Sequence, residues 1–566
     1  MTGVRTLIAI ALLIAEAAHA GTQTNGEPSR DGARDVAMPA GAQVGICVST
    51  LSGKVLKKIN AEQNFIPASN LKIVTTGVTL KQLGAGFRFE TSLAYSGNVD
   101  EDGVLRGDLY IIGGGDPTLG SPAALAIPKD SLFARWGRAV RGTGIRSIAG
   151  SIVADSRRMP AEVNGSWMYE DMGTYYGATC SALMFNENCL GITIAPGKEV
   201  GDAIELFQPA GVSIRSIKAD GKSSEMDADG CLRLPDRPWM TIKNSCSTGS
   251  EGSGDKSYLF VSEFAPTGQL VGTYAAGRKA KTVNYNDPFA DFSCAYEFAS
   301  FLAENGIPCA AVTATSSCHP TASFRMSYPA DDSAKCPGSD GITAYNGDGA
   351  EPVFGFETFD TSGSLTYSRH FTPQDSLTSI TKTLSPQLSE IIRETLRTSN
   401  NLYSEALLHA LAPGGGTEDA LKSELQALEI MGVETSRARL DDGSGLSRKN
   451  SVSPEFLVSF LTAMSRQSCF GTYLRSLNTP GPDERLFSAA APELRCRIRL
   501  KSGSMRGVLC YSGYILPSSA VVSRNRTSED SSADETIAFS IMINGSTQST
   551  SRLRNYIEHV LTEFLR

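Results

Sequence analysis

The apolar positions near the start of the chain follow a helical period. Leu71, Val74 and Val78 recur at roughly helical spacing, and Gly84 follows as a C-terminal stop. This pattern predicts a helix that begins near Ser69, just after a short turn. The first turn of a helix offers free N–H groups and the positive end of the helix dipole, and both favour negative charge.

Short apolar runs bounded by turn residues predict strands towards both ends of the chain. The predicted strands cover residues 44–48, 53–56, 497–500, 508–516 and 536–543. The first two are close enough in sequence to form a hairpin. A helical pattern resumes near Leu377, is interrupted at 398–401, and ends in an amphipathic helix over 553–564. We expect this last helix to pack on a core rather than on a membrane, because it carries few basic residues.

The middle of the chain has a different pattern. From about Phe87 to His370 there are many short strand signals separated by turns rich in Gly, Asp and Ser. We interpret 95–370 as an inserted β-rich region of one or two domains, and 21–94 together with 371–566 as one discontinuous domain of α/β class. A length of 566 residues agrees with more than one core.

The N-terminus predicts export. Arg5 precedes an apolar run over 7–15, and Ala18-His19-Ala20 gives a small-x-small cleavage pattern. We therefore interpret 1–20 as a secretory signal peptide and expect the protein in the periplasm. No other stretch approaches 18 unbroken apolar residues, so no integral membrane span is expected after cleavage.

Charge and cysteine content narrow the chemistry. The net charge is −8 with no basic cluster, which argues against nucleic acid or an anionic membrane surface as a partner. An even count of twelve cysteines in an exported chain favours disulfides, and we expect most of the eight in the insert to pair with one another. No His-Glu-x-x-His and no paired Cys-x-x-Cys is present, so neither a metal nor a cofactor is predicted.

Two short motifs suggest nucleophilic catalysis. Ser69-x-x-Lys72 places a hydroxyl and an amine one helical turn apart. A serine needs a neighbour to take its proton, and a lysine can do so if burial and nearby cations keep it neutral. Both residue types are common, so this motif alone is weak. In Ser399-x-Asn401, the serine can relay a proton to the leaving group and the amide can hold Lys72 and a substrate carbonyl.

A third motif, Lys501-Ser502-Gly503, suggests recognition of the substrate. Lys501 and Ser502 suit a substrate carboxylate, and Gly503 allows close approach of the backbone to the substrate. Arg499 would face the same side of the strand, so it is a competing candidate for the carboxylate. The N–H groups of Ser69 and Ser504 can form an oxyanion hole.

The three motifs in this order resemble the signature of penicillin-binding proteins. Further blocks extend the resemblance to class C low-molecular-mass penicillin-binding proteins, the serine-type D-alanyl-D-alanine carboxypeptidase/endopeptidase family. These blocks are Pro67–Lys72, Gly113–Leu119, Asn186–Asn188, Asp442–Ser447 and Lys501–Met505.

The resemblance implies a penicilloyl-transferase (β-lactamase/transpeptidase-like) domain, with an antiparallel five-stranded sheet flanked by helices and a large insertion between the first two motifs. It also implies action on peptidoglycan stem peptides through an acyl-enzyme, acylation by β-lactams, and no cofactor. The preference for carboxypeptidase or endopeptidase activity and the oligomeric state stay open.

Two other functions share part of this pattern. A β-lactamase would need a glutamate for deacylation, and Glu405 and Glu424 lie between the second and third motifs, though not in a recognisable pattern. A non-catalytic cell-wall peptide-binding protein would need only the carboxylate clamp. A Ser-His-Asp hydrolase would need a nucleophile elbow, which is absent, so His370 and His409 are interpreted as surface or structural residues.

Overall fold

The chain is represented by a computed structural model. The structure describes residues 38–160, 162–207, 216–217, 223–224, 231–234, 237–262, 267–315, 322–325, 376–481, 486–488, 490, 492–518 and 535–565. The predicted signal peptide, residues 1–20, lies outside these ranges. Within them, no helix is both long and apolar enough to cross a membrane.

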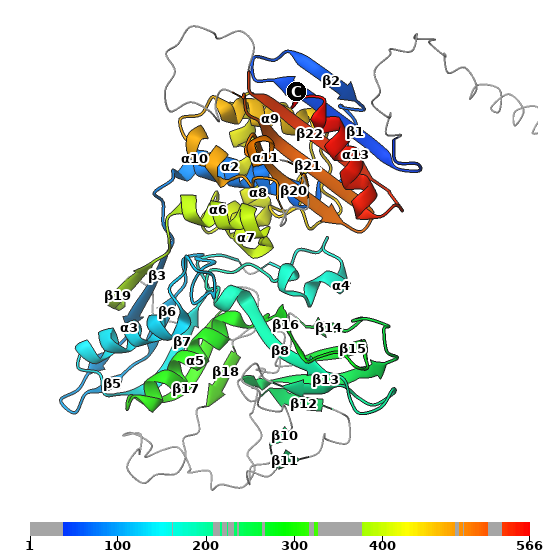
Figure 1. The fold of residues 1–566 in the computed structure, drawn as a ribbon. Coiled ribbons are helices and arrows are strands. Elements are labelled where there is room, and N and C mark those ends of the chain that lie inside the picture. Colours follow the sequence, from blue (N-terminus) through cyan, green and yellow to red (C-terminus); the bar gives the residue numbers. More distant parts are fainter. Residues whose placement is uncertain are drawn as a thin grey trace, which may run out of the picture. The chain divides into compact units, whose positions relative to one another are not determined.

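A five-stranded antiparallel sheet brings the two ends of the described chain together, as predicted (Figure 1). The strand order is β2-β1-β22-β21-β20, so β20 forms one edge. Its strands are β1 (Gln43–Thr50), β2 (Val55–Ile59), β20 (Ile498–Met505), β21 (Val508–Ile515) and β22 (Ile537–Asn544). Strand β20 extends beyond the predicted 497–500 and carries the whole Lys-Ser-Gly motif.

Helices cover both faces of this sheet because its strands alternate their side chains between two cores. On β1, Cys47 belongs to a core shared with the helices of one face, whereas Ile46 and Val48 belong to the core beneath the closing helix α13. That closing helix packs on a core, as predicted. The helices of this region are α2 (Lys72–Leu83), α6 (Leu388–Thr398), α7 (Asn401–His409), α8 (Thr417–Ile430), α9 (Pro454–Ser465), α10 (Phe470–Ser476), α11 (Pro492–Arg495) and α13 (Thr550–Thr562).

The inserted region contains a second, eight-stranded sheet with the order β18-β17-β7-β6-β3-β19, to which β4 and β5 are added. Helices α3 (Lys129–Gly142) and α5 (Ala290–Glu304) pack on it and share its apolar core. Its strands are β3 (Glu90–Tyr95), β4 (Asn98–Val99), β5 (Val104–Arg106), β6 (Leu109–Ile112), β7 (Ser147–Asp155), β17 (Cys309–Thr315), β18 (Ala322–Arg325) and β19 (Thr378–Leu384).

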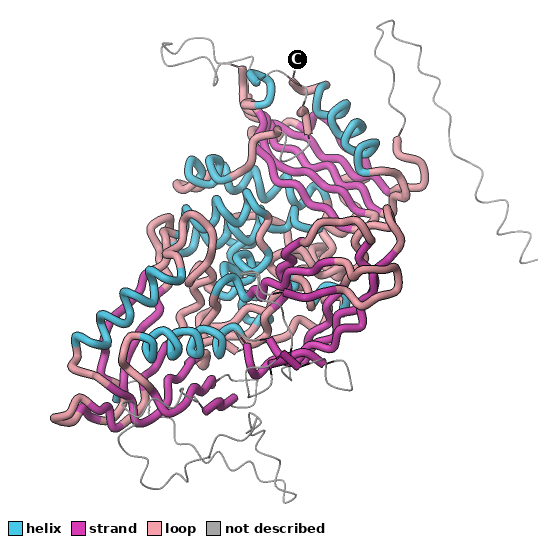
Figure 2. Tube along the Cα trace, turned by 60° about the horizontal axis from the view of Figure 1, so that its bottom comes forward, coloured by secondary structure: helices cyan, strands magenta, loops and turns pink. Residues whose placement is uncertain are grey.

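Smaller sheets complete the inserted region, whose strands and helices are distinguished in Figure 2. Their strands are β8 (Cys189–Ala195), β9 (Glu205–Phe207), β10 (Ser216–Ile217), β11 (Ser223–Ser224), β12 (Cys231–Leu234), β13 (Arg237–Gly249), β14 (Tyr258–Val261), β15 (Thr267–Ala275) and β16 (Lys281–Asn286). Short helices α4 (Tyr169–Met172), η2 (Tyr175–Gly177) and η3 (Asn186–Asn188) precede β8 in sequence, between it and β7 of the second sheet.

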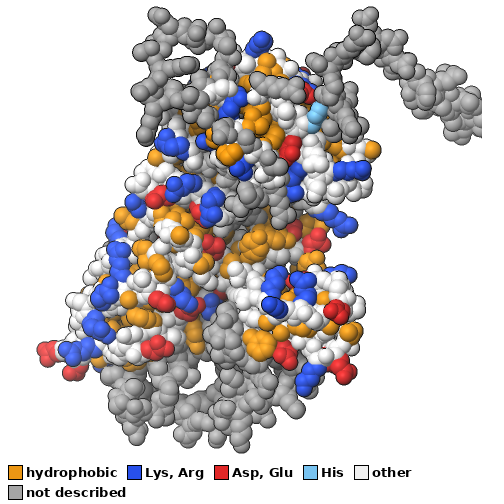
Figure 3. Space-filling model, viewed as in Figure 1, with side chains coloured by type: hydrophobic (Ala, Val, Ile, Leu, Met, Phe, Trp, Pro, Cys, Tyr) orange, Lys and Arg blue, Asp and Glu red, His pale blue; other side chains and the backbone are white. Residues whose placement is uncertain are grey.

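One predicted boundary of the insert, between residues 94 and 95, falls inside strand β3. Because β3 pairs with β19 and β6, the whole of this strand belongs to the second sheet. The other boundary, before residue 371, lies outside the described residues. Lys and Arg are scattered over the face of the described surface drawn in Figure 3, in agreement with the lack of a basic cluster in the sequence.

Seven of the described cysteines do not form the predicted disulfides. The thiols of Cys47, Cys180, Cys189, Cys246, Cys294, Cys469 and Cys510 are free. The pairing prediction is therefore wrong for four of the eight insert cysteines, and the side chains of Cys231, Cys318 and Cys336 lie outside the described part. A buried cysteine packs as a small apolar residue, as Cys180 does beside the Met184 sulfur at 3.7 Å.

Burial should make these thiols slow to react in the native protein. It raises the pKa of Cys510 to about 12 and that of Cys47 to about 11, so little thiolate is present. We expect alkylation at pH 8 without reductant to modify at least seven thiols after unfolding. In the folded protein, the less buried Cys469 should react first. Mass spectrometry that found fewer than seven reactive thiols in denaturant would contradict the free state of these residues.

Candidate active site

Ser69 lies in a strained turn at the start of helix α2. The turn η1 (Ala68–Leu71) leads directly into Lys72, and Gly84 ends the helix with a φ of 80°, as predicted. Ala68 has a φ of 49°, which is unusual for a residue with a side chain. Strain of this kind persists only where the surroundings enforce it, and it occurs preferentially at functional sites.

The Lys72 side chain is fully buried and its amine contacts Ser69. Its Nζ lies 3.0 Å from Ser69 Oγ, 2.6 Å from Asn401 Oδ1 and 2.6 Å from the carbonyl oxygen of Ser444. Burial, and then the charge of Lys501, lower the pKa of Lys72 to about 7, although nearby carboxylates oppose this shift. A lysine in this environment can be neutral near pH 7 while it contacts the serine hydroxyl.

Two of the three contacts to Lys72 come from segments that are far away in sequence. Helix α6 ends at Thr398, the next residue, Ser399, has a left-handed φ of 58°, and α7 begins at Asn401. The chain thus reverses its path between the two helices, and Asn401 can reach Lys72 with its amide oxygen. The other end of the Asn401 amide donates to the carbonyl oxygen of Tyr176, at 2.7 Å, which belongs to the insert.

The Ser444 carbonyl is a contact that the sequence analysis did not identify. It lies in the glycine-rich loop 442–447, which was singled out only as a block of resemblance. Gly445 has a φ of 81°, and a Cβ at this position would lie 2.0 Å from the Ala68 carbonyl oxygen. Glycine therefore lets the loop pack directly against the turn that carries Ser69. The run of glycines was the signal for a close backbone approach, but it did not identify the lysine as the partner.

Glu187 of the insert is a second residue that the sequence analysis did not place in the site. It lies in η3, whose three residues have φ values of 51°, 56° and 50°. Its Oε1 accepts hydrogen bonds from Ser121 Oγ at 2.6 Å and Tyr403 Oη at 2.9 Å, and its Oε2 lies 3.4 Å from Asn400 Nδ2. Since Asn400 caps α7, Glu187 supports the helix start that carries the second motif.

The third motif lies on the edge strand β20. Leu500 exchanges both backbone hydrogen bonds with Asn478, on the side of β20 that faces away from β21. Because every second residue directs its N–H to the same side of a strand, the N–H of Ser504 also points away from β21. Gly503 faces the nucleophile turn, and a Cβ there would lie 2.5 Å from the Pro67 carbonyl oxygen. This glycine permits contact between two protein segments, whereas the sequence analysis assigned it to contact with substrate. Lys501 is only 1% exposed.

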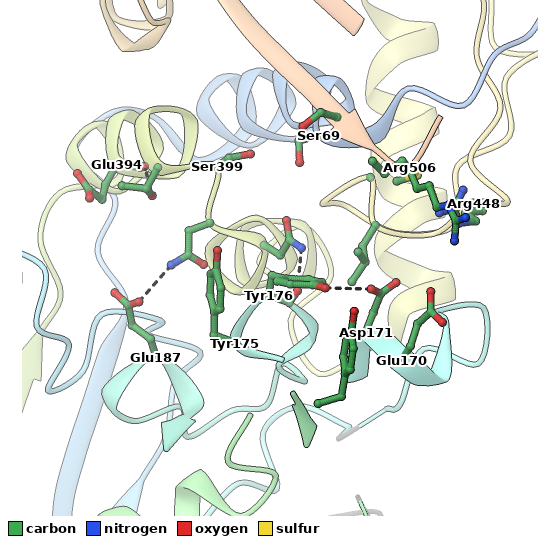
Figure 4. Close-up of a pocket in the computed structure, with 18 of the residues that line it drawn as sticks. Ser69, Glu170, Asp171, Tyr175, Tyr176, Glu187, Glu394, Ser399, Arg448 and Arg506 are labelled. Carbon is green, nitrogen blue, oxygen red and sulfur yellow. Dashed lines mark hydrogen bonds between the residues drawn. The ribbon is translucent and has the colours of Figure 1, made fainter. Parts of the chain in front are cut away.

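A cavity of about 1000 Å³ opens beside Ser69. Four of the eight predicted residues line it, namely Ser69, Ser399, Asn401 and Ser504. In Figure 4, Ser69 and Ser399 lie on one side of the pocket, and residues of the insert form the opposite side. The insert contributes Glu170, Asp171, Tyr175, Tyr176 and Glu187, while Arg448 and Arg506 also line the cavity.

The other predicted residues lie behind or beside the cavity wall. Lys72 and Lys501 are buried, and neither Ser502 nor Gly503 is among the residues that line the pocket. Arg499 directs its Nη1 to the carbonyl oxygens of Cys496 and Ile498, at 2.7 and 3.0 Å. Its guanidinium is thus engaged near the start of its own strand.

The remaining titratable residues named from the sequence are buried or lie outside the described part. Burial raises the pKa of Glu405 and of Glu424 to about 8, and neither residue lines the cavity. His409 is also buried and its pKa is lowered by burial, whereas His370 lies outside the described residues. Among the described residues, no group of three or more His, Cys, Asp or Glu side chains is arranged to hold a metal ion.

The fold and the site together define a class of protein. A Ser-x-x-Lys turn packed against an edge strand with Lys-Ser-Gly, with Ser-x-Asn between two helices, is the arrangement of penicillin-binding serine enzymes. The sequence model of the D-Ala-D-Ala carboxypeptidase 3 (S13) family matches residues 33–236 and 361–564. The chain belongs to this family, as the sequence resemblance predicted, and is a serine-type D-Ala-D-Ala carboxypeptidase.

Individual relatives agree with this assignment. The chain is 25% identical over 488 residues to a D-alanyl-D-alanine carboxypeptidase of Actinomadura sp. (strain R39), covering 83% of this chain and 74% of the relative. It is 23% identical over 532 residues to penicillin-sensitive carboxypeptidase A of Dictyostelium discoideum, covering 90% and 84%. Penicillin binding protein 4 from Haemophilus influenzae has the same fold, with a TM-score of 0.67, 17% identity and coverage of 93% and 97%.

The contact between β20 and the nucleophile turn can be tested at Gly503. Gly503→Ala would place a Cβ 2.5 Å from a backbone oxygen, so strand and turn must separate. We expect a loss of stability of about 1–3 kcal/mol and at least about a tenfold slower acylation by a β-lactam. Thermal unfolding and stopped-flow acylation measure both effects.

The matched control is Gly471→Ala in α10, where the nearest atom to a new Cβ is the terminal Arg475 Nη1 at 3.4 Å. Alanine is the better helix former, so this variant should be at least as stable as the unaltered protein and should be acylated at the same rate. Normal acylation of Gly503→Ala would show that the close approach is not needed.

Proposed function

We propose that this enzyme cleaves the terminal D-Ala–D-Ala peptide bond of peptidoglycan stem peptides through an acyl-enzyme on Ser69. Lys72 takes the proton from Ser69 Oγ as the hydroxyl attacks the carbonyl carbon. The C-terminal D-alanine leaves with a proton, and water then hydrolyses the ester. The observation that carries this proposal is the 3.0 Å contact between Ser69 Oγ and a buried lysine whose pKa is lowered to about 7.

The pocket supplies the other groups that such a reaction needs. The N–H groups of Ser69 and Ser504 would bind the oxygen that becomes negative in the tetrahedral intermediate. Ser399 lies in the same cavity and can pass the proton from Lys72 to the leaving amine. Asn401 holds Lys72 and can also contact the amide group of the substrate.

Recognition of the substrate's carboxylate is assigned to β20. Lys501 lowers the pKa of Lys72, so its positive charge acts on the site although the side chain is buried. A positive charge at the edge strand also attracts the free carboxylate of a terminal D-residue. We assign this binding to Lys501 and Ser502, with Gly503 keeping the strand close to the nucleophile.

The structure disfavours a β-lactamase mechanism that uses Glu405 or Glu424. Glu405 accepts hydrogen bonds from the backbone N–H groups of Gly443 and Ser444, at 3.2 and 2.8 Å, and is buried. Glu424 is fully buried. Neither can direct a hydrolytic water from the cavity, so we expect the penicilloyl-enzyme to persist. Penicillin binding protein 4 of Haemophilus influenzae has been solved in complex with a β-lactam.

The place of action follows from the substrate and the N-terminus. Peptidoglycan lies outside the cytoplasmic membrane, and residues 1–20 have the pattern of a secretory signal. We propose that the protein is exported to the periplasm and that the signal is removed there. N-terminal sequencing of the exported protein tests this step, because an intact residue 1 would contradict cleavage.

Labelling with a fluorescent penicillin tests the proposed chemistry. We expect the adduct on Ser69, and we expect Ser69→Ala to remove it without loss of the folded state. Ser399→Ala is the matched control from the same cavity and should still be labelled at Ser69, more slowly. Peptide mass mapping identifies the modified residue, and an adduct on Ser399 would overturn the assignment. Hydrolysis of purified muropeptides, with release of D-alanine, then tests the natural reaction.

The pH dependence of labelling should report Lys72. The neutral amine is the base, and it is populated above the pKa of about 7. The acylation rate should therefore rise through pH 7 and fall about tenfold for each pH unit below it. Lys72→Arg keeps the positive charge but not the base, and should be unlabelled across the range. A rate independent of pH between 5 and 9 would exclude Lys72 as the base.

The carboxylate assignment predicts a selective effect of Lys501→Ala. A charge-assisted hydrogen bond contributes about 1.5–3 kcal/mol, or roughly ten- to a hundredfold in kcat/KM. Amidation of the substrate's C-terminus should cost the unaltered enzyme this much. Lys501→Ala should slow the free acid far more than the amide, whereas Arg499→Ala should slow both equally. If Lys501→Ala penalised both substrates equally, Lys501 would act on Lys72 rather than on the carboxylate.

A further inference from the structure

One peptide group links the Lys72 amine to a second buried charge. The carbonyl oxygen of Ser444 accepts a hydrogen bond from Lys72 Nζ at 2.6 Å. The N–H of the same peptide group, which belongs to Gly445, donates to Asp442 Oδ1 at 2.7 Å. The amine, the peptide group and the carboxylate are thus joined by a chain of two hydrogen bonds. The Gly445 backbone also packs closely against the turn that carries Ser69.

The Asp442 carboxylate is held entirely by N–H donors. Its Oδ1 also accepts from Asn450 Nδ2 at 2.8 Å, and its Oδ2 accepts from the Ser447 N–H at 2.6 Å and from Trp167 Nε1 at 2.9 Å. Two acceptor bonds at each oxygen match the ionised form, which has no proton to donate. Asp442 is fully buried, so its negative charge is little screened by water.

We propose that Asp442 is a positioning residue for Lys72, which it orients and tunes through the peptide group between Ser444 and Gly445. The proposal rests on the proposed role of Lys72 as base. A carboxylate at the N–H end of a peptide group makes its carbonyl oxygen a stronger acceptor. The Ser444 carbonyl then fixes one hydrogen-bond direction of the lysine amine, and Ser69 Oγ lies along another of the amine's directions.

The charge of Asp442 also offsets part of the burial of Lys72. Burial and Lys501 lower the pKa of Lys72, whereas Asp442 and then Glu405 raise it. The groups that face Lys72 are Ser69 from η1, Asn401 and Glu405 from α7, Lys501 from β20 and Asp442 from the loop, with Glu424 of α8 beyond Glu405. Removing the negative charge of Asp442 leaves the effect of burial less opposed, so the pKa of Lys72 should fall further.

Asp442→Asn tests this through the pH profile of acylation by a penicillin. The neutral amine would be populated at lower pH. The acid limb, which is the part of the pH profile where the rate rises with pH, should therefore move to lower pH by about half a unit or more. The maximal rate should fall about tenfold, because the Ser444 carbonyl is held less firmly. The matched control is Asp441→Asn, which removes the same charge from the preceding residue. Asp441 contacts the hydroxyls of Ser166 and Ser447 and not the peptide group between Ser444 and Gly445. The acid limb of the Asp441→Asn variant should therefore stay at the pH of the unaltered protein.

Trp167→Phe provides a second variant that keeps the carboxylate. It removes one N–H from Asp442 Oδ2, so more negative charge acts on Lys72 and the acid limb should move to higher pH. The opposite directions of the two shifts would support the proposal. If Asp442→Asn does not fold, the direction in which Trp167→Phe shifts the acid limb decides whether the proposal holds.

A lower rate with an unmoved acid limb in these variants would show that Asp442 serves only the stability of its loop, and would overturn the proposal. If Ser69 of the unaltered protein is not acylated, the proposed function itself fails. Acylation of Ser69 with unmoved limbs in the variants leaves that function intact, so the two failures are distinguishable.

Discussion

The buried amine of Lys72 is the constraint on which the rest of the site depends. An ammonium group out of water is costly unless it is surrounded by acceptors or loses its proton. The protein supplies acceptors from three separate segments, namely the Ser69 hydroxyl, the Asn401 amide and the Ser444 carbonyl. It also places the Lys501 charge nearby, which favours the neutral form. The amine is therefore held in one position and stays near the point where it can exchange a proton at neutral pH.

The inserted region contributes to the catalytic arrangement as well as to the substrate pocket. The Tyr176 carbonyl accepts from Asn401, Glu187 supports the start of α7, and Trp167 donates to Asp442. Each contact reaches a residue that either touches Lys72 or supports one that does. The insert thus bears on the second motif and on the glycine-rich loop at once. A change in its packing should therefore affect the position of the Lys72 amine.

The sequence predicted the parts of the site that depend on residue type and order. The three motifs, the helix after Ser69 and the strands of the five-stranded sheet follow from local pattern, and the structure contains the predicted helix and sheet. The Ser444 contact could not be predicted, because its acceptor is a backbone atom that any residue could provide. Glu187 was hidden for a related reason, since its role depends on a left-handed turn that brings it to Tyr403. The disulfide prediction relied on an even cysteine count, which does not distinguish bonded thiols from cysteines packed as apolar residues.

Backbone strain is concentrated around the same centre. Ala68 precedes the nucleophile, Ser399 separates α6 from α7, and η3 carries Glu187; all of them have positive φ. A non-glycine residue in this region costs roughly 1–3 kcal/mol, and folded structure elsewhere must compensate. The two extensive cores on either side of the five-stranded sheet can provide that compensation. Because strained turns have few alternative conformations that keep their neighbours packed, they fix Ser69, Ser399 and Glu187 more tightly than relaxed loops could. The site therefore gains a defined geometry at the expense of local stability.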